Sequence, residues 1–258
     1  MTTTTFLPPF SPAQDADAIL RQRGYALLSP EGVSDWTGCS TAQLQALATG
    51  WDDLPPDEYL KDGGRYRRRR HSCFTVDAGQ VQPVPHRAHW QPVQYNALHG
   101  GMQRWFAPML ANTVHQPAWS ALLAALARSS DALFAQPDLP NGHPRWCVEA
   151  HQFRIDTTDG IGRPTPEGAH RDGVDLVAVF LIAREGIKGG ETRVFESAGP
   201  NGQRFTLTEP WSVLLLDDAR VVHESTPILP LQQGGHRDTL VVTCRRNSFQ
   251  REGVQNLA

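Results

Sequence analysis

The chain has 258 residues, of which 40% are hydrophobic and 20% are charged, and its formal net charge is -3. This length and composition predict one large domain or two small ones with a substantial core, and they exclude a largely disordered chain. The weak net charge argues against a protein that binds nucleic acid or membrane over its whole surface, and no run of about 18 apolar residues is present to span a bilayer.

The opening residues lack the basic and apolar regions of a secretory signal, so we expect a cytoplasmic protein. Its four cysteines (Cys39, Cys73, Cys147 and Cys244) are widely spaced and have no CxxC arrangement. A thiolate zinc site or a disulfide framework is therefore not expected, and buried thiols in a reducing compartment are the simplest interpretation.

The first half of the chain is predicted to be helical and irregular. Residues 11–14 and 40–43 each combine a serine N-cap with a glutamine three residues later, and Gly50 supplies a stop signal. Residues 118–135, rich in Ala and Leu, form the best long helix. Residues 61–92 contain Gly-Gly, several prolines and a basic run, and we interpret them as a loop with at most one short strand.

The second half changes to strand patterns. Residues 148–155 partly alternate, as in a strand with one buried face, and the continuous apolar run at 175–183 indicates a strand covered on both faces. Further strands are predicted at 191–196, 204–208, 211–216 and 239–244. These strands predict a β-sandwich or barrel with helices packed on one face. We expect a single domain with a helical or irregular half at about 1–145 and a β core at about 146–246.

A metal site is predicted from three residues in this β region. His170 and Asp172 are two residues apart, so in extended backbone their side chains point to one face, and His223 follows the apolar strand near 213–216. An H-x-D pair alone is common, and partly exposed side chains are the alternative. Two imidazoles and one carboxylate on one face suit Fe(II) and leave positions for a chelating co-substrate and O₂.

Arg237 stands at the entry to the strand predicted at 239–244. A guanidinium at that point can bind a carboxylate with two parallel hydrogen bonds. Thr239 projects from the same face and can donate its hydroxyl to the same carboxylate. The alternative is a surface arginine on an edge strand, and the preceding H-x-D…H set favours the carboxylate clamp.

The ordered set His170-x-Asp172, His223 and Arg237 resembles the Fe(II)/2-oxoglutarate dioxygenase superfamily, whose fold is a double-stranded β-helix (a jelly-roll, cupin-like core). The segments 165–173, 189–192, 214–228 and 237–243 resemble, more closely, a bacterial branch that hydroxylates free amino acids, the isoleucine 4-hydroxylase-like enzymes.

This resemblance implies Fe(II), 2-oxoglutarate and O₂ as cofactors. It implies that His170, Asp172 and His223 are the catalytic iron ligands, and that Arg237, helped by Thr239, binds the distal carboxylate of 2-oxoglutarate. The expected reaction is hydroxylation of a free L-amino acid at an unactivated C–H bond, with release of succinate and CO₂.

The basic run RYRRRRH at 65–71 has three interpretations: a solvated or acid-paired segment, a substrate-binding segment, or a nucleic-acid contact. The net charge makes nucleic acid the weakest of the three. A substrate carboxylate needs a bidentate cation. Candidate substrate-binding residues are Tyr66, Arg67, Arg69, Arg70 and, on the strand at 148–155, Arg154.

Two other functions stay open at this point. One keeps the iron chemistry but changes the target to a natural-product intermediate, a peptide or an alkylated base. The other is a metal-free β-barrel that only binds a ligand. We assign no ligand role to His86, His89 or His99, which lie in the irregular region, and the sequence does not predict an oligomeric state.

Overall fold

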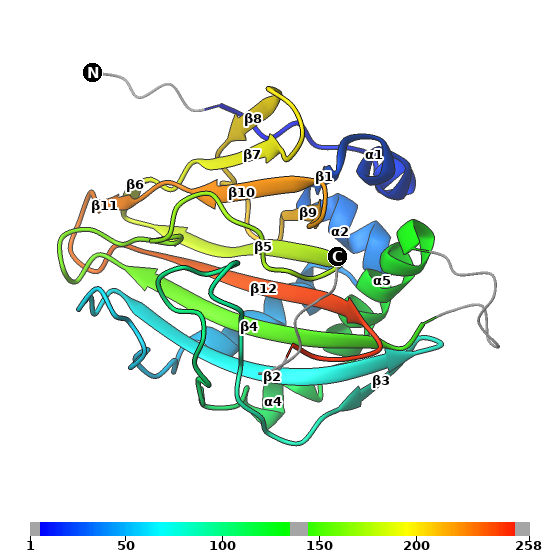
Figure 1. Cartoon of the computed structure of the whole chain (residues 1–258), viewed down its shortest axis with the longest axis horizontal. Helices are drawn as coiled ribbons and strands as arrows, with labels where there is room; N and C mark the ends of the chain where they lie inside the picture. The colour runs from blue at the N-terminus through cyan, green and yellow to red at the C-terminus, as the bar shows by residue number, and fades with distance from the viewer. Residues whose placement is uncertain (1–5, 135–143, 251–258) are drawn as a thin grey trace.

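The computed structural model describes residues 6–134 and 144–250 (Figure 1). Its helices lie in the first half of the chain, and none of those described is long and apolar enough to cross a bilayer. They are η1 (Ala13–Asp15), α1 (Ala16–Arg23), α2 (Pro30–Thr37), α3 (Thr41–Ala46), η2 (Leu47–Trp51), α4 (Ala111–Val114) and α5 (Pro117–Phe134).

A large antiparallel sheet forms the centre of the molecule. Its strands, in spatial order, are β1 (Tyr25–Leu28), β9 (Val213–Asp217), β5 (Leu176–Glu185), β12 (His236–Arg246), β4 (Trp146–Asp156), β2 (Arg67–Asp77) and β3 (Gln80–Pro83). Two smaller antiparallel sheets pair β10 (Val221–Ser225), β7 (Thr192–Glu196) and β8 (Gly202–Phe205), and β11 (Ile228–Pro230) with β6 (Ile187–Gly189). The arrangement is a double-stranded β-helix, as the family resemblance implied.

Strand β5 has two buried faces because it lies between two layers. Phe180 and its alternate neighbours pack in the core beneath the helices, whereas Val177 and Leu181 pack against the small sheet that contains β7, β8 and β10. Successive strand residues point to opposite faces, so an apolar layer on each side requires a continuous apolar run. The prediction for 175–183 is confirmed, and the helices cover one face of the large sheet (Figure 1).

Several predicted elements of the first half are also present. Ser40 and Gln43 form the reciprocal capping box that starts α3, and α5 matches the predicted long helix, whose last predicted residue, 135, lies outside the described residues. All four cysteines are buried and unpaired.

The prediction for residues 61–92 was wrong. This segment contains the eleven-residue strand β2, which pairs with β4 along ten residues, followed by β3. The strand was missed because arginines occupy both of its faces: Arg67 and Arg69 are buried, whereas Arg68 and Arg70 are not. The inward face of β2 lines a polar cavity, so hydrophobic alternation, the usual sign of a strand, is absent.

Candidate active site

His170 and His223, distant in the sequence, are brought together by a direct backbone contact. Each donates its N–H to the carbonyl of the other, at 3.1 and 3.0 Å, which forms an isolated antiparallel bridge between the loop before β5 and the centre of β10. Their ring centroids are 4.7 Å apart. With Asp172, the three side chains offer ligand atoms within 4.8 Å of one another, so the predicted triad forms one cluster.

The surroundings of the two imidazoles fit metal coordination. Nδ1 of His170 donates to the carbonyl of Gly168 at 2.9 Å, which leaves the Nε2 lone pair free. His223 is 8% exposed, and burial lowers its pKa, so its imidazole is neutral. Burial alone would lower the pKa of His170, but the charges of Asp172 and Glu167 outweigh it and raise that pKa. This negative potential favours a cation, and the donor set suits Fe(II).

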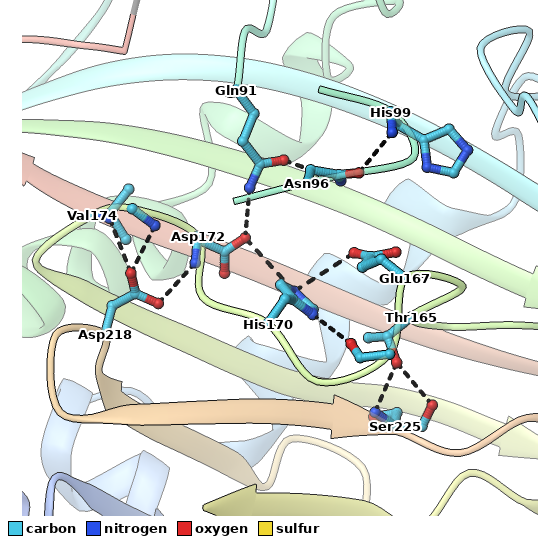
Figure 2. A network of polar contacts seen from close by, with 12 residues as sticks. Gln91, Asn96, His99, Thr165, Glu167, His170, Asp172, Val174, Asp218 and Ser225 are labelled. Carbon is cyan, nitrogen blue, oxygen red and sulfur yellow. Dashed lines mark hydrogen bonds and ion pairs between the residues drawn. The ribbon is translucent and has the colours of Figure 1, made fainter. Parts of the chain in front are cut away.

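The loop that carries Asp172 is held by a second carboxylate (Figure 2). Asp218 accepts hydrogen bonds from the backbone N–H groups of Asp172, Gly173 and Val174 at 2.9, 2.7 and 3.1 Å. The amide of Gln91 donates to Oδ1 of Asp172 at 3.2 Å. The carboxylate of Asp172 is thereby oriented from both its backbone and its side chain.

Arg237 is a buried cation, and no carboxylate of residues 6–134 or 144–250 forms an ion pair with it. Its side chain lines the same cavity as the triad, it is 3% exposed, and its Nε and Nη2 atoms have no hydrogen-bond partner among the described residues. Burial, and then the nearby charge of Arg184, lower its pKa to about 10, so it stays charged at neutral pH. Thr239 and Val241 follow on the same face of β12 and also line the cavity. This end of the cavity can hold a carboxylate.

Two of the candidate substrate-binding arginines also line the cavity. Arg67 donates to Asp57 at 2.7 Å and keeps a buried, unpartnered Nη2. The guanidinium of Arg69 lies between the rings of Phe106 and Phe153, 3.8 and 4.3 Å from their centroids. Both arginines are buried and therefore rigidly placed.

The other three candidates are engaged elsewhere. The hydroxyl of Tyr66 donates to Asp62 at 2.6 Å. Arg70 donates to the backbone carbonyls of residues 53 and 108. Arg154 forms two bonds, of 2.8 and 2.6 Å, with the carboxylate of Asp238. None of the three lines the cavity, and their roles as substrate contacts stay predictions.

Sequence reasoning did not assign roles to four charged or polar cavity residues. Glu149 and His151 lie on β4 two residues apart and face the cavity, and Arg104 and His89 reach it from the irregular region. The alternation of side chains along β4 could have indicated that Glu149 faces the cavity. No periodic signal was available for Arg104, which is 2% exposed and has unpartnered Nε and Nη2 atoms.

Comparison with known proteins identifies the family. Residues 48–243 match the family described as 2OG-Fe dioxygenase. The chain belongs to this family. It therefore shares the family's use of Fe(II), 2-oxoglutarate and O₂, and the His170, Asp172 and His223 cluster provides a site that fits the iron. No curated protein matches the sequence significantly.

The solved structures agree with this assignment. A bsmA homolog from Methylobium petroleophilum PM1 is 51% identical to this dioxygenase, with a TM-score of 0.87. The match covers 97% of this chain and 99% of the homolog. Two more distant structures share the fold. IDO from Bacillus thuringiensis is 17% identical, with 95% of this chain and 100% of that chain covered and a TM-score of 0.71. The Fe(II)/(alpha)ketoglutarate-dependent dioxygenase TqaL is 20% identical, with 95% of this chain and 90% of that chain covered and a TM-score of 0.69.

Proposed function

We propose that this dioxygenase hydroxylates a free, zwitterionic L-amino acid with an aliphatic side chain. In this proposal His170, Asp172 and His223 hold the ferrous ion, and Arg237 with Thr239 binds the distal carboxylate of 2-oxoglutarate. When bound, the iron supplies activation of O₂ coupled to decarboxylation of 2-oxoglutarate. The residues of the chain orient both substrates and exclude water.

Charges at the iron end of the cavity leave no requirement for a charged substrate. Under this assignment the two positive charges of Fe(II) and the one of Arg237 balance the two negative charges of 2-oxoglutarate and the one of Asp172. Buried charges need compensation. The net charge of the substrate is then set by the remaining wall of the cavity.

The positive and negative charges of that wall are also equal in number, and this observation carries the proposal. Six charged side chains line or back it: the guanidinium groups of Arg67, Arg69 and Arg104 and the carboxylates of Asp57, Glu149 and Glu167. Burial lowers the pKa of His89 to about 3 and also lowers that of His151, so these imidazoles add no charge at neutral pH. A substrate with zero net charge preserves the balance.

The same wall nevertheless offers separate binding groups for opposite charges. Buried, unpartnered N–H groups remain on Arg67 and Arg104, and the carboxylates of Glu149 and Glu167 line the same cavity. Buried donors and acceptors without partners cost free energy, about 1–3 kcal/mol each and more when charged, unless a ligand satisfies them. A molecule with one carboxylate and one ammonium group meets both needs.

Apolar side chains complete the cavity. They include Phe153, Ile155, Val174, Val179 and Val241. An aliphatic side chain beside them would be removed from water, and its reacting C–H bond would be selected by the shape of the cavity. We therefore expect the hydroxylated carbon to lie on an aliphatic side chain.

Succinate release, measured with each of the twenty free amino acids and paired with mass detection of a product heavier by one oxygen atom, tests the proposal. We expect stimulation by one or a few neutral aliphatic amino acids. Stimulation by a peptide, an alkylated base or a non-amino-acid natural product, with none by free amino acids, would show that the substrate class is wrong.

A spectroscopic control separates an enzyme from a metal-free binding protein. Anaerobic Fe(II) and 2-oxoglutarate should give a weak visible charge-transfer band with the wild-type protein. The band should disappear in His170→Ala and persist in His115→Ala, which replaces an exposed histidine outside the cavity. A wild-type protein without the band would favour the binding protein.

A further inference from the structure

A second cluster of titratable side chains lies away from the triad, and three of its four members line the cavity. It comprises three histidines and a glutamate, with ligand-type atoms within 4.8 Å of one another: His71, His89, Glu149 and His151. His71 and His151 are cross-strand partners with stacked rings 4.5 Å apart, and Glu149 is two residues before His151 on β4. His89 comes from the chain that follows β3. The iron site uses none of the four.

The hydrogen bonds of this cluster concentrate on one oxygen of Glu149. Nε2 of His71 and Nδ1 of His89 both donate to Oε2, at 3.0 and 2.7 Å, whereas Oε1 accepts no hydrogen bond from the described residues. Burial alone would raise the pKa of Glu149, but the attraction and hydrogen bonds of His89 and His71 lower it, so the carboxylate is ionised. Glu149 is a fixed anion with one oxygen available.

The same bonds determine where the imidazoles carry their protons. Since Nδ1 of His89 donates to Glu149, its Nε2 carries a lone pair, and no described residue donates to it. Both Glu149 and His89 line the cavity that contains the iron triad. Together they offer two acceptors, one charged and one neutral, to a donor that enters the cavity.

Arg104 lies beside this pair of acceptors. The backbone of His89 donates to the carbonyl of Arg104 at 2.9 Å, and the backbone of Arg104 donates back at 3.0 Å, so the two residues face each other in an antiparallel bridge. The unpartnered guanidinium atoms of Arg104 are donors for a carboxylate. The ammonium and carboxylate of an amino acid share one carbon atom, so their binding groups must also be neighbours.

We infer that Glu149 and His89 form the subsite for the substrate ammonium group, next to a carboxylate subsite at Arg104. This inference rests on the proposed function and deepens it. Glu149 supplies the charge, His71 fixes the orientation of Glu149, and the His89–Arg104 bridge sets the spacing between the two subsites. The ligand class is a primary α-amino acid, and a deaminated acid of the same skeleton lacks half of the recognised groups.

A metal ion is the other cation that four such side chains suggest, and the surroundings disfavour it. Nη2 of Arg69 lies 2.6 Å from Nδ1 of His151, so Nδ1 accepts and the ring proton lies on Nε2, where it blocks coordination. A divalent ion would also add two positive charges near Arg69 and Arg104 with a single carboxylate to compensate. An ammonium group brings its own carboxylate for the guanidinium.

Binding measurements with matched ligands test the subsite. The protein is loaded anaerobically with Fe(II) and 2-oxoglutarate and titrated calorimetrically with L-valine, L-leucine and L-isoleucine. It is titrated in parallel with 3-methylbutanoate, 4-methylpentanoate and 3-methylpentanoate, which lack the ammonium group. The variants are Glu149→Gln and, as a matched control, Glu167→Gln, which changes another carboxylate of the cavity. The charge-transfer band checks that each variant still assembles the iron site.

We expect the wild-type protein to prefer an amino acid over its deaminated partner by about 10- to 100-fold, as for hydrogen bonds to charged groups. Glu149→Gln should remove most of that preference and leave the affinity for the deaminated acid unchanged, and Glu167→Gln should keep the preference. If Glu149→Gln lowers the affinities for the amino acid and for its deaminated partner equally, Glu149 has a structural role and the inference is overturned. Loss of the preference in Glu167→Gln instead would also overturn it.

Two further outcomes separate this inference from the proposed function. If the wild-type protein binds none of the free amino acids, the proposed function fails, and the subsite fails with it. If it binds them and Glu149→Gln retains the full preference, the subsite alone is wrong. Elemental analysis that finds two metal ions per wild-type chain and one in Glu149→Gln would replace the ammonium subsite with a metal site.

Discussion

Replacement of Arg237 by methionine should have opposite effects on stability and on ligand binding. Arg237 is buried, its guanidinium has unpartnered atoms, and no carboxylate in the described part of the chain forms an ion pair with it. The lowering of its pKa from 12.5 to about 10 corresponds to a cost of about 3 kcal/mol for keeping the charge in the folded protein at neutral pH. Methionine removes that charge and retains most of the side-chain volume.

Without ligands, Arg237→Met should therefore unfold at a higher temperature than the wild-type protein. A gain of up to about 3 kcal/mol corresponds to a rise of up to roughly 10 °C for a chain of this size, less whatever packing the arginine stem loses. In contrast, affinity for 2-oxoglutarate should fall by at least about 100-fold, because the buried carboxylate would lose a charge-assisted bidentate partner.

Differential scanning calorimetry with and without 2-oxoglutarate measures both effects. The control is Arg154→Met on neighbouring β4, which leaves the buried carboxylate of Asp238 without its partner. That variant should unfold at a lower temperature and bind 2-oxoglutarate normally. The reasoning is refuted if Arg237→Met is less stable than the wild-type protein without ligand, or if it still gains stability from 2-oxoglutarate.

The remaining predictions concern stability. Because folding lowers the pKa of His89 from 6.5 to about 3, the unfolded chain takes up a proton below pH 6.5 that the folded chain does not, and stability falls as the pH falls. Between pH 7 and 5 this costs about 2 kcal/mol, so urea unfolding of His89→Asn should show a shallower pH dependence by that amount, and identical slopes would contradict the assignment. Gly50→Ala should cost about 1–3 kcal/mol, since an added Cβ would lie 2.4 Å from the amide of Gln152 and 2.7 Å from the hydroxyl of Thr113. Gly38→Ala, with open space around it and a positive φ, is the comparison for backbone strain alone, and it should lose less.

The β core and the iron triad could be predicted because their signals are local and periodic. His170 and Asp172, two residues apart in the sequence, point to the same side of their loop in the structure, as the spacing predicted. Arg237 was predicted to be a carboxylate clamp because it follows the H-x-D…H set, and in the structure it lines the cavity together with Thr239 and Val241 of the same strand. The shared face of Arg237 and Thr239 follows from strand geometry alone.

The substrate wall could not be predicted in the same way. Strand β2 presents arginines to the cavity, so its inward face is as polar as a solvent-exposed face, and the two cannot be distinguished from the sequence. The pairing of His89 with Arg104 depends on two backbone hydrogen bonds within an irregular segment, for which no pattern of residue types exists. Polar cavities in general lack the hydrophobic contrast on which sequence interpretation depends.

On the paired strands β2, β4 and β12, the residues that line the cavity and the residues that pack in the core alternate along the chain. Odd-numbered positions, such as Arg69, His151 and Thr239, line the cavity, whereas even-numbered ones, such as Ala150 and Val242, pack in the core beneath the helices. Substrate preference can therefore drift, in nature or in directed evolution, through odd-numbered substitutions that leave the even-numbered scaffold intact. A library confined to these odd-numbered positions should contain more folded variants with altered substrate preference than a random library of equal mutational load.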